Sequence, residues 1–212
     1  MNIVGIQGSP SHASRSASLL ALALSRLSGA ARQSTLVSVR ELPAHALLHA
    51  RFDHPRIRAA LDQIAAADLL LIATPIYKAA YSGVLKAFLD LLPQDGLRGK
   101  TVLPLATGGS IAHLLALDYA LKPVLSALGA RDILDPVFAT DAQMPRHDLQ
   151  EHAIASEVVQ RVEEALQTVL ERAEALERRA DAVREREALL ARLSPAPGAP
   201  GSWRASDLRW SV

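Results

Sequence analysis

The sequence contains no cysteine among its 212 residues, which excludes disulfides, thiolate metal sites and a cysteine nucleophile. Aromatic residues make up only 4% of the chain and the formal net charge is +1. The chain therefore has neither the aromatic residues for a stacking platform nor the positive charge that would favour nucleic-acid binding. The apolar runs are interrupted well short of the length that spans a bilayer, so no membrane segment is expected.

Apolar residues are abundant by contrast, and they make up 50% of the chain. This composition and length are typical of a packed domain of ordinary size. The first residues, Met1 to Val4, run directly into a predicted strand and leave no room for a signal peptide. We therefore expect a cytoplasmic protein.

Strand and helix patterns alternate along the first two thirds of the chain. The periodicity predicts strands at 2–8, 33–39, 68–74, 101–106 and 132–138, and helices at 14–27, 55–67, 82–92 and 111–128. The continuous apolar run at 68–74 is typical of a strand covered on both faces. The alternation predicts an α/β domain over residues 1–155, with a doubly wound parallel sheet between two helical layers.

The pattern changes after this domain. Residues 144–152 are polar and predict turns, and a long helix is predicted over 156–193. Its apolar seam, repeating every seven residues, consists of Val162, Val169, Leu176, Val183 and Leu190. Two interpretations stay open: the seam packs on the domain, or its charged outer half pairs with another subunit. Residues 194–212 read as a flexible tail rich in proline and glycine.

A small-residue loop, Gly8 to Ser16, follows the first predicted strand and opens a helix. The hydroxyls of Ser9, Ser14 and Ser16 and the guanidinium of Arg15 converge there on a positive helix end, which suits a phosphate. The loop lacks the glycine spacing of dinucleotide folds and the Gly-Lys-Ser/Thr ending of a nucleotide P-loop. Taken alone, an ordinary N-cap explains the same residues equally well.

Two further loops are expected at the same edge, because ligands of open parallel sheets bind beyond the carboxyl ends of the strands. In the loop predicted at 75–81, Pro75, Ile76 and Tyr77 offer apolar and aromatic surface to a planar ring. In the second, Thr107, Gly108, Gly109 and Ser110 let backbone amides approach a ligand, and a helix starting after them would add positive potential. Together the three loops predict FMN, whose ring carries out hydride chemistry itself, so no catalytic side chain is predicted.

Other candidate residues carry weaker signals. His45 and His49 have the spacing of two metal ligands on a helix, but no third ligand accompanies them and no metal site is predicted. Lys86 and Asp90, four residues apart, predict a solvated ion pair on a helix. His113 is interpreted either as a hydrogen-bonded structural histidine or as a contact to the flavin edge or a neighbouring subunit.

Several ordered stretches, taken together, point to a known family. They are Gly8-Ser9-Pro10 with Ser14-Arg15-Ser16, Ala50–Asp53, Ala73–Gly83, Leu103–Gly109, Ala112–Ala116 and Asp118–Leu125. With these residues the chain resembles the NADPH-dependent FMN reductase family of flavodoxin-like proteins. The resemblance is strongest to the sulfonate-starvation FMN reductases, which supply reduced flavin to alkanesulfonate monooxygenases.

The resemblance implies a five-stranded sheet in the flavodoxin order 2-1-3-4-5, with FMN at the strand ends and NADPH stacked over its ring. It implies phosphate contacts from Ser9, Ser14, Arg15 and Ser16, and ring contacts from Pro75, Ile76, Tyr77, Thr107, Gly108, Gly109 and Ser110. For Arg15, the 2′-phosphate of NADPH is an alternative partner.

Members of the family assemble as dimers or tetramers, so the resemblance also implies a homo-oligomer with the site bordered by a neighbouring subunit. Tyr119 shares its predicted helix with Pro123, which favours a local irregularity. In the sulfonate-linked reductases a tyrosine here is associated with a helix interruption at the tetramer interface and with flavin release. A packing role for Tyr119 is the alternative.

The expected function is hydride transfer from NADPH to FMN, followed by release of reduced FMN to a partner monooxygenase. One alternative is a flavodoxin-type electron carrier. Such carriers are strongly acidic, whereas this chain has a sequence pI of about 8.2. The other alternative is an enzyme that retains FMN and reduces quinones or azo compounds.

Overall fold

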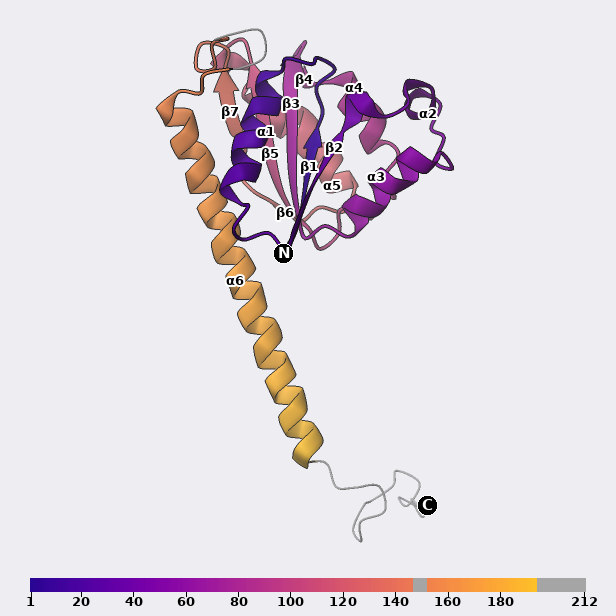
Figure 1. The fold of residues 1–212 in the computed structure, drawn as a ribbon, viewed down its shortest axis with the longest axis vertical. Helices are drawn as coiled ribbons and strands as arrows, with labels where there is room; N and C mark the ends of the chain where they lie inside the picture. Colours follow the sequence, from indigo (N-terminus) through magenta and orange to yellow (C-terminus); the bar gives the residue numbers. More distant parts are fainter. Residues whose placement is uncertain (147–151, 194–212) are drawn as a thin grey trace, which may run out of the picture. The chain divides into compact units, whose positions relative to one another are not determined.

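The computed structural model describes residues 1–146 and 152–193, and a parallel sheet lies at its centre (Figure 1). The strands are β1 (Asn2–Gln7), β2 (Gln33–Ser38), β3 (Leu69–Tyr77), β4 (Ala80–Tyr81), β5 (Thr101–Gly108), β6 (Asp132–Ile133) and β7 (Val137–Thr140). The α-helices are α1 (Arg15–Arg26), α2 (Ala44–Leu48), α3 (Pro55–Ala65), α4 (Gly83–Leu89), α5 (Lys122–Ala127) and α6 (Ser156–Leu193). Two short 3₁₀ turns, η1 (Val39–Glu41) and η2 (Ile111–His113), and a π-helical turn, η3 (Leu117–Leu121), complete the described elements.

The sheet has seven strands rather than the predicted five, and its order differs accordingly. Its main path is β2-β1-β3-β5-β6, all parallel, with β4 added to β3 and β7 added to β5. The predicted fifth strand at 132–138 is two short strands, β6 and β7, that both pair with β5. Pro136 lies in the gap between them and has no N–H to donate to a ladder.

Each face of the sheet buries its own apolar cluster, as alternation along a strand requires. In β3, Leu69 and Leu71 belong to one cluster with α1 and α6, while Leu70 and Ile72 belong to the other with α3, α4 and α5. The predicted helical layers on both faces are therefore confirmed, and the continuous apolar run of β3 follows from burial on both sides.

The predicted loop over 75–81 is instead a continuation of β3 and a tight hairpin. β3 runs on through Tyr77, and β4 pairs with it antiparallel, Ile76 opposite Tyr81. The turn between them is made by Lys78 and Ala79, which have positive φ angles of 50° and 63°. Positive φ is ordinarily signalled by Gly or Asn, and neither residue is present at this turn, so local sequence does not predict the hairpin.

The helix predicted over 111–128 is interrupted. A 3₁₀ turn over Ile111–His113 comes first, then the π-helical turn η3 over Leu117–Leu121, and only Lys122–Ala127 forms the α-helix α5. The irregularity expected near Tyr119 is thus present as a π-turn, immediately before the helix that contains Pro123. The side chain of Tyr119 is 80% exposed on it.

The long helix predicted over 156–193 is confirmed as α6. Val158, Val162, Leu166 and Val169 are buried in the cluster that also holds α1, so its first part packs on the domain as one interpretation expected. Residues 1–170 form one compact unit and the chain from Glu171 belongs to a second, in which Val183 and Leu190 are exposed. Pairing of this outer part with another subunit remains a prediction.

Residues 144–152 are only partly as predicted. Met144 closes a turn that begins at Asp141, as predicted, but its side chain is fully buried in the α1–α6 cluster. Residues 147–151 lie outside the described residues, as does the predicted tail at 194–212. Within the described ranges, no helix combines the length and the apolarity needed to cross a bilayer.

Candidate functional site

The first loop leads from β1 into α1 and buries three hydroxyls. Ser9 is 1%, Ser14 8% and Ser16 0% exposed. Ser14 is the N-cap of α1, and its Oγ accepts a hydrogen bond from the Ala17 N–H at 3.4 Å. The N-cap interpretation is therefore correct for Ser14, but it does not account for the burial of Ser9 and Ser16.

The hydrogen bonds within this loop do not use every hydroxyl proton, so some remain to be donated to a ligand. Ser14 Oγ and Ser16 Oγ lie 2.9 Å apart, and whichever of them donates, the other keeps its own proton. Ser9 Oγ accepts from the Ser11 N–H at 3.2 Å, a contact that does not use the Ser9 proton. A phosphate accepts several such donors at once, so the donor set fits a phosphate.

Gly8 is required where the loop leaves β1. A Cβ at this position would lie 2.9 Å from the Leu85 Cβ and 3.0 Å from the Ala73 carbonyl oxygen, closer than real side chains approach. The Gly8 N–H donates to the same Ala73 carbonyl at 2.7 Å. The first loop is thus packed directly against β3 and the start of α4.

The hairpin end of β3 is bound to the first loop by side-chain hydroxyls. Ser82 Oγ donates to the Gly8 carbonyl and accepts from the Leu85 N–H, so Ser82 is the N-cap of α4, as expected. Thr74 Oγ1 accepts from the Ser82 N–H at 3.0 Å. These buried contacts fix the hairpin relative to the loop.

The segments 75–77 and 107–110 lie side by side at the carboxyl ends of β3 and β5. In the β3–β5 register Pro75 is opposite Thr107, so parallel pairing brings the two segments together. Thr107 is 4% exposed and the Tyr77 side chain is 49% exposed. Ile76 is only 6% exposed and belongs to the core, so its side chain offers little surface to a ring.

The end of β5 is shaped by its glycines. Gly108 is buried, and a Cβ there would meet the Phe138 ring at 3.1 Å and His113 Nδ1 at 3.3 Å, whereas Gly109 and Ser110 are exposed and a Cβ at Gly109 has open space. His113 Nδ1 is buried without a hydrogen-bond partner in the described structure, so this nitrogen gives no support to the interpretation as a hydrogen-bonded structural histidine. The helix predicted after Ser110 is present only in part: it begins as a 3₁₀ turn, continues through the π-helical turn η3 and becomes α-helical at Lys122.

Arg15 contacts Asp141, a partner that the sequence did not predict. Its Nη1 lies 3.3 Å from Asp141 Oδ1, and its Nε donates to the Met144 carbonyl at 2.8 Å. The Asp141 N–H in turn donates to the Gly108 carbonyl at 3.0 Å. Asp141 is distant in sequence and belongs to no motif. Its position directly after a strand at the sheet edge is the only signal that marks it.

A histidine completes the surroundings of Arg15. His152 Nδ1 and Ser18 Oγ lie 3.1 Å apart, so the segment after β7 is joined to α1 a second time. Burial first, and then the positive charges of Arg15 and Arg146, lower the pKa of His152, while Asp141 opposes the shift. His152 is therefore held toward its neutral form beside this arginine pair.

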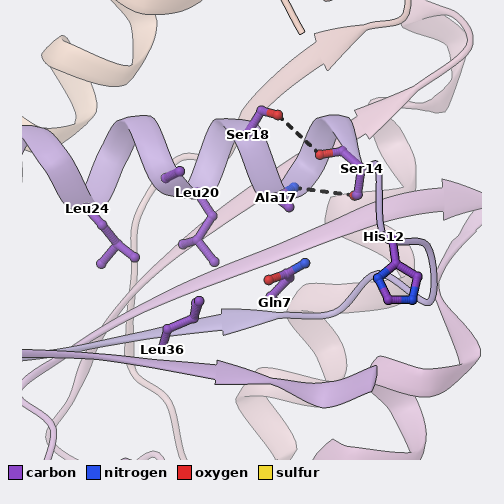
Figure 2. A pocket seen from close by; sticks show the side chains of 9 residues that line it. Gln7, His12, Ser14, Ala17, Ser18, Leu20, Leu24 and Leu36 are labelled. Carbon is purple, nitrogen blue, oxygen red and sulfur yellow. Dashed lines mark hydrogen bonds between the residues drawn. The ribbon is translucent and has the colours of Figure 1, made fainter. Parts of the chain in front are cut away.

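A cavity of about 310 Å³ opens between α1 and the sheet, beside the first loop (Figure 2). Its apolar part is lined by Leu20 and Leu24 of α1, which face Leu36 of β2, and its polar end by Gln7, His12 and Ser14. It adjoins the phosphate end of the predicted site, and the predicted ring contacts do not line it.

The remaining candidates lie away from this edge. Lys86 Nζ and Asp90 Oδ1 form the expected exposed pair at 2.6 Å. The rings of His45 and His49 lie with their centroids 4.6 Å apart. Among residues 1–146 and 152–193, no group of three or more His, Cys, Asp or Glu side chains is placed to hold a metal ion.

The parallel sheet and the loops at its carboxyl edge define a flavodoxin-like α/β protein. A family model described as NADPH-dependent FMN reductase matches residues 1–144. The chain belongs to the NADPH-dependent FMN reductase family. It is an oxidoreductase of that class, with FMN as substrate or cofactor and NAD(P)H as reductant.

Individual relatives are consistent with this family. The chain is 53% identical to an FMN reductase (NADPH) of Escherichia coli (strain K12) over 144 residues, which cover 68% of this chain and 75% of the relative. It is 45% identical to an FMN reductase (NADPH) of Pseudomonas putida (strain KT2440) over 100% of both chains. Among solved structures, the apo form of the NADH:FMN oxidoreductase EMOB superposes with a TM-score of 0.71 at 42% identity, covering 78% of this chain and 86% of that one.

Proposed function

We propose that the protein transfers hydride from NADPH to N5 of FMN and releases reduced FMN to a partner flavin-dependent monooxygenase of the alkanesulfonate type. The observation that carries the proposal is the junction of three loops at one sheet edge, where Ser82 contacts Gly8 and Pro75 lies opposite Thr107. The relatives named FMN reductase (NADPH) support NADPH as the hydride source. This role belongs to sulfonate metabolism in the cytoplasm.

Two groups of residues at this sheet edge bind FMN, one at its phosphate and the other at its ring. The hydroxyls of Ser9, Ser14 and Ser16 bind the phosphate, together with backbone N–H groups at the start of α1. Pro75 and Tyr77 border the ring on one side, and residues 107–110 border it on the other, while the Ile76 side chain packs in the core with α4.

When bound, FMN supplies the hydride-accepting ring, so the protein needs no general acid or base. The backbone N–H groups of residues 107–110 are the donors that the chain offers to negative charge developing on the ring. Donors held in place before the reaction stabilise such charge without reorganisation.

We further propose that the reductase acts as a homo-oligomer, a dimer or a tetramer. The supporting observation is that three large apolar side chains within nine residues, Ile111, Leu115 and Tyr119, are 64%, 58% and 80% exposed. Large exposed apolar side chains that gather in one region typically mark an interface. Residues 1–155 are proposed as the reductase domain that carries this surface, followed by the helix at 156–193.

Steady-state NADPH oxidation by protein passed through gel filtration tests the proposed function. We expect the protein to emerge with little FMN and the rate of NADPH oxidation to rise with added FMN until it saturates. If the protein instead keeps stoichiometric FMN and added FMN does not accelerate NADPH oxidation, the flavin-supplier function is wrong. Turnover that requires an added quinone or azo compound would identify the retained-FMN alternative.

A further inference from the structure

Asp141 connects the two ends of the proposed flavin site. Its backbone N–H donates to the carbonyl of Gly108, in the segment proposed to border the ring. Its carboxylate lies 3.3 Å from the guanidinium of Arg15, the first residue of α1 and a neighbour of the phosphate-binding hydroxyls. One residue outside every motif thus contacts both the ring side and the phosphate side.

Arg15 is held in a fixed orientation but remains accessible. Its Nε donates to the carbonyl of the buried residue Met144, which fixes the plane of the guanidinium. The Arg15 side chain is 31% exposed and that of Asp141 is 49% exposed. A guanidinium has five N–H donors, and these two contacts use Nε and one side of Nη1. A phosphate arriving from solvent therefore meets an arginine that already shares its charge with a carboxylate.

We propose that Asp141 limits how tightly the protein binds the phosphate of FMN. Its carboxylate cancels part of the positive charge of Arg15 and repels a phosphate dianion directly. FMN is consequently bound firmly enough to be reduced and loosely enough to be released. This inference rests on the proposed function, because it requires the flavin phosphate at the β1–α1 loop.

The structure offers a matched control for the charge change. At the other end of α1, Arg26 Nε lies 3.0 Å from Glu163 Oε1 of α6, with side chains 50% and 51% exposed. Glu163→Gln removes the carboxylate charge that faces an arginine of α1, as Asp141→Asn does. Glu163 lies away from the carboxyl ends of the strands. A change in FMN affinity in Glu163→Gln would therefore report the effect of total charge alone.

The experiment titrates flavin-free protein with FMN and with riboflavin, which lacks the phosphate, and follows quenching of flavin fluorescence. For a partly exposed ion pair, we expect Asp141→Asn to lower the Kd for FMN by about two- to fivefold and to leave riboflavin unchanged. The gain should shrink as salt increases. Glu163→Gln should change neither Kd, and Arg15→Gln should weaken FMN but not riboflavin.

Three results would overturn the proposal. They are an FMN affinity that is unchanged or weaker in Asp141→Asn, an equal tightening of FMN and riboflavin, and an Arg15→Gln variant that binds FMN as wild type does. An Arg15→Gln variant with unchanged FMN affinity overturns the proposal even if Asp141→Asn fails to fold. NADPH oxidation by the wild type reports on the proposed function separately, since the FMN-to-riboflavin affinity ratio needs no NADPH.

Discussion

The side chain of Ser82 donates a hydrogen bond to the backbone carbonyl of Gly8, which lies 74 residues earlier in the chain. The same oxygen accepts from the Leu85 N–H at 3.2 Å and so caps α4. A single buried hydroxyl therefore fixes the start of a helix and the first residue of the proposed phosphate loop together.

Ser82→Ala should lower the free energy of unfolding by about 2 to 4 kcal/mol, because it removes an N-cap and leaves the Gly8 carbonyl without this donor. Urea denaturation measures the loss. Ser110→Ala is the control, since Ser110 is exposed and makes no side-chain cap, and it should stay within about 0.5 kcal/mol of wild type. Equal losses in the two variants would contradict the role of Ser82.

Gly8→Ala should destabilise the protein by about 1 to 3 kcal/mol and weaken FMN binding, because the new Cβ collides with Leu85 and the Ala73 carbonyl. Gly109→Ala places its Cβ in open space and should leave stability nearly unchanged. Thermal unfolding and FMN titration of both variants provide the measurements. A Gly8→Ala protein as stable as Gly109→Ala would show that the close approach is not a constraint.

Lys100→Met should cost about 1 to 3 kcal/mol at neutral pH, because Lys100 Nζ donates to the carbonyls of Ala65 and Ala67 at the end of α3, at 2.7 Å and 2.8 Å. The exposed Lys86→Met is the control and should change stability little. Urea denaturation at neutral pH compares the two.

The same residue predicts a pH dependence. Burial lowers the pKa of Lys100 below its usual value of 10.5. The folded state then releases this proton before the unfolded state does, so wild type should gain stability relative to Lys100→Met as pH rises toward 10.5. A stability difference that does not vary with pH in that range would contradict the buried ammonium.

Tyr119→Ala should reduce assembly of the protein while leaving the fold intact, because the side chain is 80% exposed on the π-turn within the proposed interface. Sedimentation velocity measures the assembly state, and circular dichroism measures the fold. Leu36→Ala, which truncates a 54% exposed side chain on β2, is the control and should assemble as wild type does. Unchanged assembly in Tyr119→Ala would remove this surface from the interface.

Much of the fold was predictable because burial leaves a strong periodic signal. The apolar run of β3, the α1 N-cap at Ser14 and the full span of α6 all follow from local pattern. The hairpin turn was not predictable, because Lys78 and Ala79 adopt positive φ without the residues that usually signal it. The register with β4 supplies what the local sequence lacks.

The three segments of the candidate site were predictable, but the side-chain contacts between them were not. The place of Arg15 beside the phosphate loop follows from the motif, whereas its contacts with Asp141 and the Met144 carbonyl do not. Such pairings depend on where β7 ends relative to α1, which is a property of the tertiary structure. Ile76 illustrates the converse, because a residue predicted to face the ligand is needed by the core.

We propose that FMN is a diffusible substrate of this reductase. The most direct test is anaerobic reduction with excess NADPH and FMN in large molar excess over protein, followed by loss of flavin absorbance. Repeated turnover should bleach the whole FMN pool at a rate proportional to protein concentration. Bleaching that stops at one flavin per protomer would contradict the claim and identify a protein that retains its flavin.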